Sequence, residues 1–209
     1  MFPRKRTLAD LSRGAMKSFK TLFMRKETKK ELNRRLAEAI GHGDIEQIKC
    51  LLDRGASPNA EGVWTEGSGR RPIIHHIFRW TRDEREVLDI IKVLVRSGAN
   101  LNSRDILNGP GNTVLMNAAS FRLPDVVEWL INNGANLEIK NDKGKNVFQL
   151  IKATNNWDYR AVRGLVARSS DDGRQWLESV DGKGWIATVI AKDPMSARYL
   201  PLAQQPRNE

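Results

Sequence analysis

The sequence contains few of the residues that most often carry catalysis or bind metal ions. It has one cysteine, Cys50, and three histidines among its 209 residues. A single cysteine excludes an internal disulfide bond and fits a reducing, intracellular compartment. His75 and His76 are adjacent, so on a helix they point in different directions and cannot readily share a metal ion. We therefore expect no metal site, no cofactor and no enzymatic activity.

Long apolar runs are also absent. No segment approaches the roughly 18 to 20 apolar residues of a membrane span, and the N-terminus lacks the apolar stretch of about 7 to 15 residues that marks a secretory signal. These absences predict an intracellular, cytoplasmic protein that is either soluble or peripherally associated with a membrane.

The sequence lacks recognisable phosphate-binding and calcium-binding loops. The glycine-rich segment 61–70 is not followed by Gly-Lys-Ser or Gly-Lys-Thr, as a phosphate-binding loop would be. Asp171, Asp172 and Asp181 do not have the spacing of a calcium loop, and we expect them to lie in solvated loops.

A phrase of ten residues is present three times, at residues 51–60, 94–103 and 130–139 (LLDRGASPNA, LVRSGANLNS and LINNGANLEI). Its glycines, Gly55, Gly98 and Gly134, lie 43 and 36 residues apart. A recurrence at this distance indicates a repeat protein rather than a fold with one central core.

Each repeat carries two helical patterns. The first is a short set of inward-facing residues at i, i+3 and i+4, and the second consists of apolar residues seven, four and three positions before each glycine. The first set comprises Leu36, Ala39 and Ile40; Ile73, His76 and Ile77; and Leu115, Ala118 and Ala119, and the second comprises Ile48, Leu51 and Leu52; Ile91, Leu94 and Val95; and Val127, Leu130 and Ile131.

Signals for the start and end of the second helix are present in each repeat. Asp44 with Gln47 and Thr81 with Glu84 have the spacing of capping boxes, and Pro124 suits a first helical position. The repeated glycine can adopt the left-handed conformation that ends a helix. Each repeat is therefore predicted to be a helix pair.

These residues resemble the ankyrin repeat. Pro72-Ile73 and Thr113-Val114-Leu115 stand where that family has its Thr-Pro-Leu-His opening, and the segment 98–102 (GANLN) matches its closing phrase. Arg71 and Met116 depart from the pattern. The resemblance implies an all-α, ankyrin-type helical repeat solenoid with long inter-repeat loops.

The resemblance covers about residues 33–168, within an array that we place at 31–168. Its units are expected at about 33–62, 70–104, 112–140 and 145–168, and the second helix of the fourth unit is expected to begin at Asn155 or Asn156. Residues 181–184 (DGKG) echo the loop at 142–144 (DKG). We therefore expect residues 169–209 to form a degenerate capping repeat and a tail, with a helix pair between Ile186 and Leu200 and Pro194 at a helix start.

The resemblance also implies a non-catalytic module that binds a partner protein through a concave face and inter-repeat loops. Such a module can be an adaptor, an inhibitor or an immunity-type protein. The segments 60–71 and 103–112 are long for loops in such an array, and long loops on a rigid scaffold often carry recognition. The residues that we expect at the partner are Trp64, His75, Arg79, Trp80, Arg104, Ile106, Leu107, Asn117 and Phe121.

The first thirty residues form a basic arm. They contain ten lysines or arginines against two acidic residues, so they hold +8 of the total charge of +10. Apolar residues recur in the arm at spacings of three and four, which predicts a cationic amphipathic helix. The basic residues are Arg4, Lys5, Arg6, Arg13, Lys17, Lys20, Arg25, Lys26, Lys29 and Lys30.

Four uses of the arm are compatible with its composition. It can pack on the first repeat as a cap, bind an anionic membrane surface, bind nucleic acid or another acidic partner, or serve as a targeting segment. The alternative function is therefore a peripheral membrane or nucleic-acid tether that acts through this arm.

Overall fold

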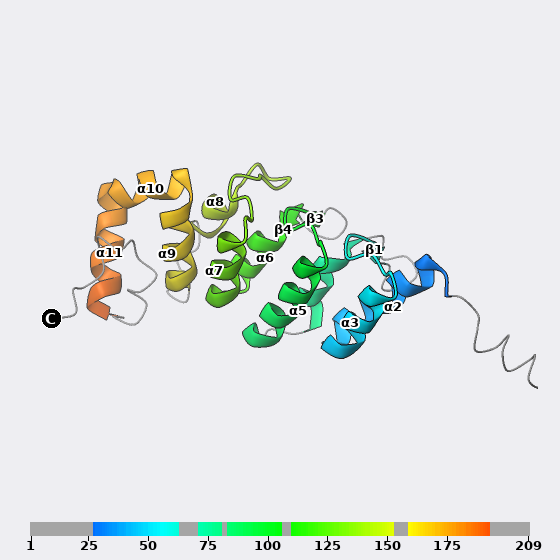
Figure 1. Ribbon diagram of the computed structural model, residues 1–209. Helices are drawn as coiled ribbons and strands as arrows, with labels where there is room; N and C mark the ends of the chain where they lie inside the picture. The colour runs from blue at the N-terminus through cyan, green and yellow to red at the C-terminus, as the bar shows by residue number, and fades with distance from the viewer. Residues whose placement is uncertain (1–26, 63–70, 81–82, 106–109, 153–158, 193–209) are drawn as a thin grey trace, which may run out of the picture.

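The helices form an elongated array that runs from one end of the described chain to the other (Figure 1). The structure is a computed structural model, and it describes residues 27–62, 71–80, 83–105, 110–152 and 159–192. Within these residues the strands are two-residue segments in two hairpins, and the rest of the regular structure is helical. The predicted helical repeat array is confirmed.

The helices are arranged in pairs that pack on one another in chain order. The helices α3, α5, α7 and α9 contact each other in turn, and α6 contacts α8. The pairs are α2 (Lys29–His42) with α3 (Ile45–Asp53); the 3-10 helix η1 (Ile73–His76) and α4 (Ile77–Trp80) with α5 (Glu84–Arg96); α6 (Val114–Ser120) with α7 (Pro124–Asn132); α8 (Val147–Lys152) with α9 (Arg160–Ser169); and α10 (Asp171–Glu178) with α11 (Val180–Lys192).

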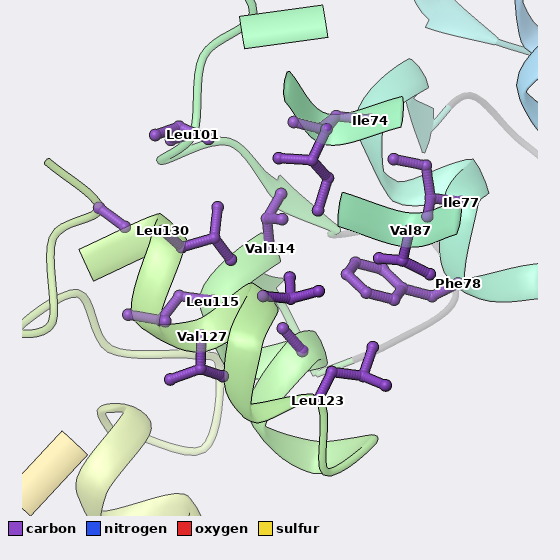
Figure 2. Close-up of a cluster of buried hydrophobic side chains, with 14 of the residues drawn as sticks. Ile74, Ile77, Phe78, Val87, Leu101, Val114, Leu115, Leu123, Val127 and Leu130 are labelled. Atoms are coloured by element: carbon purple, nitrogen blue, oxygen red, sulfur yellow. The ribbon is translucent and has the colours of Figure 1, made fainter. Parts of the chain in front are cut away.

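The inward-facing residues predicted from helical spacing form one continuous core. Those seven and four positions before each repeated glycine are at most 1% exposed, and those three positions before it are half-buried against the core. Figure 2 shows this core where the second and third pairs meet, with Phe78 and Val87 from one pair and Leu115 and Leu123 from the other. Each valine, leucine, isoleucine or phenylalanine side chain that is fully buried contributes roughly 1.5 to 3 kcal/mol to stability.

The three repeated glycines end the second helices as predicted. Gly55, Gly98 and Gly134 have φ values of 95°, 88° and 86°, in the left-handed region that other residues rarely adopt. In each case the next residue's N–H bonds back to a carbonyl in the last helical turn, as Ala99 does to Leu94 at 3.0 Å. The glycine therefore turns the chain without leaving the end of the helix unsatisfied.

In the first two copies of the phrase, an asparagine at the ninth position links one repeat to the next. The Oδ1 atom of Asn59 accepts a hydrogen bond from the Asn100 N–H at 2.7 Å. Asn102 does the same one repeat later, where its Oδ1 atom accepts from the Asn136 N–H at 2.9 Å. The first two copies of the phrase thus end their own helix and also hold the following copy in register.

Two of the predicted helix starts are confirmed. The Oδ1 atom of Asp44 accepts from the Gln47 N–H at 2.9 Å and caps α3, and α7 begins at Pro124. The predicted start of the fourth second helix, at Asn155 or Asn156, lies outside the described residues, and α9 begins at Arg160.

The predicted capping box of Thr81 with Glu84 is wrong. The α5 helix begins at Glu84 and is capped by Asp83, whose side chain accepts from the Glu86 N–H at 3.0 Å. Glu84 instead reaches the next repeat, where its Oε1 atom accepts from the Asp125 N–H at 2.6 Å and from the Val126 N–H at 3.3 Å. Because α7 has no side-chain cap of its own, Glu84 supplies that cap from the preceding pair.

The prediction for the C-terminal part of the array is also corrected. Asp171 and Asp172 lie in the first turn of α10 rather than in a loop, and residues 181–184 lie within α11. The reason is a pair of serine caps: the hydroxyl of Ser170 accepts from the Gly173 N–H at 3.1 Å, and that of Ser179 accepts from the Gly182 N–H at 3.2 Å. A terminal helix pair is present, but it begins earlier than expected, and Pro194 lies outside the described residues.

We expect the Glu84→Ala variant to lose about 1 kcal/mol of stability, because two N–H groups at the start of α7 lose their acceptor. The Glu84→Gln variant should lose less, since the amide oxygen can still accept. Urea unfolding followed by circular dichroism measures both losses. Equal midpoints for the parent and the alanine variant would contradict a stabilising cap between the repeats.

Candidate partner-binding surface

Turns between successive helix pairs project from one edge of the array (Figure 1). The first two are antiparallel hairpins, in which β1 (Glu61–Gly62) pairs with β2 (Arg71–Pro72) and β3 (Arg104–Asp105) pairs with β4 (Asn112–Thr113). Gly111, with a φ of 70°, lies in the returning arm of the second hairpin. The long loops of the sequence are therefore hairpins, whose connecting residues 63–70 and 106–109 lie outside the described residues.

Ion pairs join neighbouring turns. The Nε atom of Arg71 lies 3.2 Å from Oδ1 of Asp105, and the two side chains are only 15% and 10% exposed. Arg104 pairs with Asp142 in the next turn and also donates from Nε to the Gly111 carbonyl at 3.0 Å. A largely buried pair of this kind is costly to break, since removing one partner leaves the other charge uncompensated. The turns are therefore held together as one row.

A chain of hydrogen bonds runs beneath the row and crosses three repeats. The Nε2 atom of His75 lies 3.0 Å from the Ser103 carbonyl, and its Nδ1 atom lies 3.2 Å from Nδ2 of Asn117. Asn112 donates to the Asn117 side chain at 3.3 Å and accepts from Nδ2 of Asn141 at 2.9 Å. In this network Nε2 of His75 donates and Nδ1 accepts, so the ring is neutral.

Burial lowers the pKa of His75 below its ordinary value. The hydrogen bond to the Ser103 carbonyl and the Asp105 carboxylate act in the opposite direction, and the nearby Arg71 adds to the lowering. Protonation would place a proton on Nδ1, facing the amide donor of Asn117, so the geometry also favours the neutral ring.

The expectation that His75 contacts a partner is corrected, because its side chain is 1% exposed and lies within the hydrogen-bond chain. Arg104 and Asn117 are half-buried and take part in the contacts between repeats. Phe121 is half-buried, with its ring centroid 5.5 Å from that of Phe78. These four residues support the scaffold, and Arg104, Asn117 and Phe121 keep an exposed part.

The remaining predicted contact residues are not tested by the structure. Trp64, Ile106 and Leu107 lie outside the described residues, between the strands of the two hairpins. Arg79 and Trp80 belong to α4, of which the backbone is described. All five remain predictions.

Most of the basic arm likewise lies outside the described residues. Lys29 and Lys30 do not belong to it, because they form the exposed first turn of α2, which Thr28 caps. The carboxylate of Glu27 contacts Arg35 and Arg54 and so fixes the start of the array to both α2 and α3. The predicted basic residues from Arg4 to Lys26 are the ones that the structure does not describe.

A hollow of about 530 Å³ lies between α8, α10 and the start of α11. Its lining combines the rings of Phe148 and Trp176, 5.6 Å apart, with charged and amide groups. The Oδ2 atom of Asp172 accepts from Nε2 of Gln149 at 2.8 Å, and the ammonium of Lys152 lies 6.0 Å from the centroid of the Phe148 ring. The lining residues are Phe148, Gln149, Lys152, Asp172, Gln175, Trp176, Ser179 and Asp181.

The expectation that residues 171 and 172 lie in a loop gave no reason to predict this hollow, because α10 supplies one of its walls. A signal for the helix was present: Ser170 followed directly by two acidic residues is typical of a helix N-terminus. The position of α11 was harder to predict, since two of its first five residues are glycines, which are poor helix formers.

Neither a metal site nor a membrane span is found in the described part of the chain. No three His, Cys, Asp or Glu side chains gather there as a metal site would require, and no helix there is long and apolar enough to cross a membrane. Cys50 is exposed on α3, and the exposed His42 contacts the Glu38 carbonyl through Nδ1 at 2.7 Å. His76 is buried in the core, as predicted.

Comparison with known proteins identifies the repeats. Residues 36–141 and 83–175 match the profile of the family described as ankyrin repeats (3 copies). The chain is 26% identical over 129 residues to ankyrin repeat and SAM domain-containing protein 6 of Rattus norvegicus. The matched region covers 62% of this chain and 13% of that protein. The chain is also 25% identical over 118 residues to BRCA1-associated RING domain protein 1 of Caenorhabditis elegans. That match covers 56% of this chain and 15% of the relative.

Among solved structures, the ankyrin repeat domain of Bcl-3, a member of the IkappaB protein family, is similar to this chain. The TM-score is 0.45 at 25% identity, with 55% of this chain and 45% of that one covered. The chain thus spans a small part of the length of the two sequence relatives and about half of this structure.

We expect acidification to destabilise the array through His75. Because the pKa of His75 is lowered in the folded chain, the unfolded chain takes up a proton as the pH falls below its ordinary pKa of about 6.5, while the folded chain does not. Stability from this group is therefore present above that pH and is lost below it, by up to about 1.4 kcal/mol per pH unit.

The His75→Gln variant has no titratable group at this position and serves as the control. The difference in free energy of unfolding between the parent and this variant should shrink between pH 7.5 and pH 5.5, as measured by urea unfolding. A difference that is equal at both pH values would show that His75 titrates alike in the folded and unfolded chains.

Proposed function

The chain belongs to the ankyrin repeat family, whose repeats generally act as protein–protein interaction modules, and we propose that it is a non-catalytic module that binds a partner protein. The contact surface would be formed by the row of turns and by the exposed sides of the first helices of the pairs. Adaptor, inhibitor and immunity-type roles are three forms of this proposal, and the effect of the chain on its partner's own activity separates them.

The proposal is supported mainly by the ion pairs and hydrogen bonds that hold successive turns together. The pairs Arg71–Asp105 and Arg104–Asp142 join three successive turns across the repeats, and the hydrogen-bond chain from Ser103 to Asn141 lies beneath them. Because the bases of the turns are already ordered, little conformational entropy is lost there when a partner binds. Such a row is suited to presenting the segments between the hairpin strands to another protein.

The residues that connect the strands of the two hairpins have the composition of a contact region. Residues 63–70 contain Trp64, and residues 106–109 contain Ile106 and Leu107. Aromatic and aliphatic side chains at the centre of an interface supply much of its binding energy. We propose these three residues as the main apolar anchors.

The second candidate is the peripheral membrane or nucleic-acid tether. The eight lysines and arginines of residues 1–26, against one acidic residue, support it, since basic residues are attracted to anionic headgroups and to phosphates. In this form the arm makes the principal contact while the repeats hold cargo.

We expect the triple variant Trp64→Ala, Ile106→Ala and Leu107→Ala to weaken partner binding about tenfold or more. Affinity capture from the native cell with mass spectrometry identifies the partner, and calorimetry then measures the dissociation constant. The melting temperature should change little, because the variant changes none of the buried residues in the described part of the chain. A control variant with Lys49, Arg85 and Arg96 changed to alanine, all exposed on second helices, should bind as the parent does.

Deletion of residues 1–26 distinguishes the two candidates. The deletion stops before Glu27, so the contacts of this residue with Arg35 and Arg54 are retained. We expect partner binding to persist in the shortened chain. Loss of all binding, together with a steep salt dependence in the full chain, would support the tether instead.

A further inference from the structure

The third turn of the row carries three lysines. We name residues 139–145, which connect the closing phrase of the third repeat to α8, the lysine turn. Its lysines, Lys140, Lys143 and Lys145, are all exposed. None of the three forms an ion pair with another residue in the described part of the chain.

The backbone of the lysine turn is held in one conformation by Asn141, which is 5% exposed. Its side-chain oxygen accepts from the N–H groups of Lys143 at 3.0 Å and of Lys145 at 3.1 Å. Its own N–H donates to the Lys145 carbonyl at 3.0 Å. Gly144 allows this tight turn because it adopts a φ of 68°.

The lysine turn is also fixed to the second hairpin. Nδ2 of Asn141 donates to Asn112 at 2.9 Å, and the Asp142 N–H donates to the Pro110 carbonyl at 2.6 Å. Arg104 pairs with Asp142, the single acidic residue of the turn. The contact with Arg104 therefore compensates that acid, and three ammonium groups remain without a counter-charge on a rigid backbone.

We propose that the lysine turn is the docking point for an acidic segment of the partner protein. This inference rests on the proposed function and names the chemistry of the partner at one turn of the row. Carboxylates of the partner would meet ammonium groups whose backbone is ordered before binding, so the lysines would attract the segment and set its register.

The surroundings of the turn favour an acidic protein segment over nucleic acid. Glu138 precedes the turn, and Asp171 and Asp172 lie at the start of α10, where the side chain of Asn146 links Asp172 to Glu138. A polyanionic backbone needs an extended basic track, whereas the whole of residues 31–209 holds only +2 of the total charge of +10. A short segment with a few carboxylates can meet the lysines and avoid the flanking acids.

The test titrates the full chain with a peptide of eight glutamates and, separately, with a thymidine octanucleotide, at low salt. Backbone amide shifts in nuclear magnetic resonance spectra report binding residue by residue, so contacts of the basic arm are seen apart from those of the turn. We expect the peptide to shift the amides of residues 140–146, and added salt to reverse the shifts. Shifts confined to residues 1–30, or stronger binding of the octanucleotide than of the peptide at the turn, would overturn the proposal.

The variant Lys140→Gln, Lys143→Gln and Lys145→Gln removes the three charges and keeps Asn141 and Asp142. We expect it to weaken peptide binding at the turn about fivefold or more, while the unfolding midpoint stays close to that of the parent. The matched control is Arg85→Gln, Arg96→Gln and Lys183→Gln, which removes three exposed positive charges elsewhere. Equal weakening by both variants would overturn the proposal, since it would reflect net charge alone.

Binding to the partner itself separates this inference from the function on which it rests. One outcome is that the triple alanine variant of Trp64, Ile106 and Leu107 loses partner binding while the variant of the lysine turn binds the partner like the parent. In that case the row of turns is a binding surface and the inference about the lysine turn is wrong. If neither variant weakens partner binding, the row of turns is not the contact surface, and both the proposed surface and this inference are wrong.

Discussion

Each helix pair of this protein can bury its apolar side only against its neighbours in the chain. Leu94 and Leu130 are fully buried because the adjoining pair covers them, and the half-buried residues three positions before each glycine mark the edge of this contact. Stability is therefore shared between each pair and the interfaces on its two sides. The polar contacts between repeats, the row of turns and the hollow near the C-terminal end all depend on this stacking.

Polar groups give the stacking its register. Apolar contact alone would tolerate small shifts of one pair along the next, but Asn59 and Asn102 each bond to the backbone of the following phrase. Glu84 crosses the same kind of boundary to cap α7. Beneath the turns, His75 and Asn117 continue the pattern. The same interactions that align the repeats also order the surface on which the turns lie.

The local features of the fold were predictable because they depend on a few neighbouring residues. A glycine after an apolar helical stripe indicates a left-handed helix end, and Gly55, Gly98 and Gly134 all have this conformation. Helical spacing likewise identified the buried residues. The candidate surface was less predictable, because side chains that look available in sequence, such as His75, form their bonds with residues far along the chain.

The sequence by itself determined the repeat, its helix pairs and its family, since these follow from short-range spacing that recurs along the chain. The tertiary structure alone decided which polar residues serve the scaffold. Arg71 meets Asp105, and Asn141 meets Asn112, only after the pairs have stacked. It also decided that α8, α10 and the start of α11 enclose a hollow. Bonds between residues about thirty or more positions apart produce no periodic pattern in the sequence, because each bond depends on how two separate repeats are placed in space.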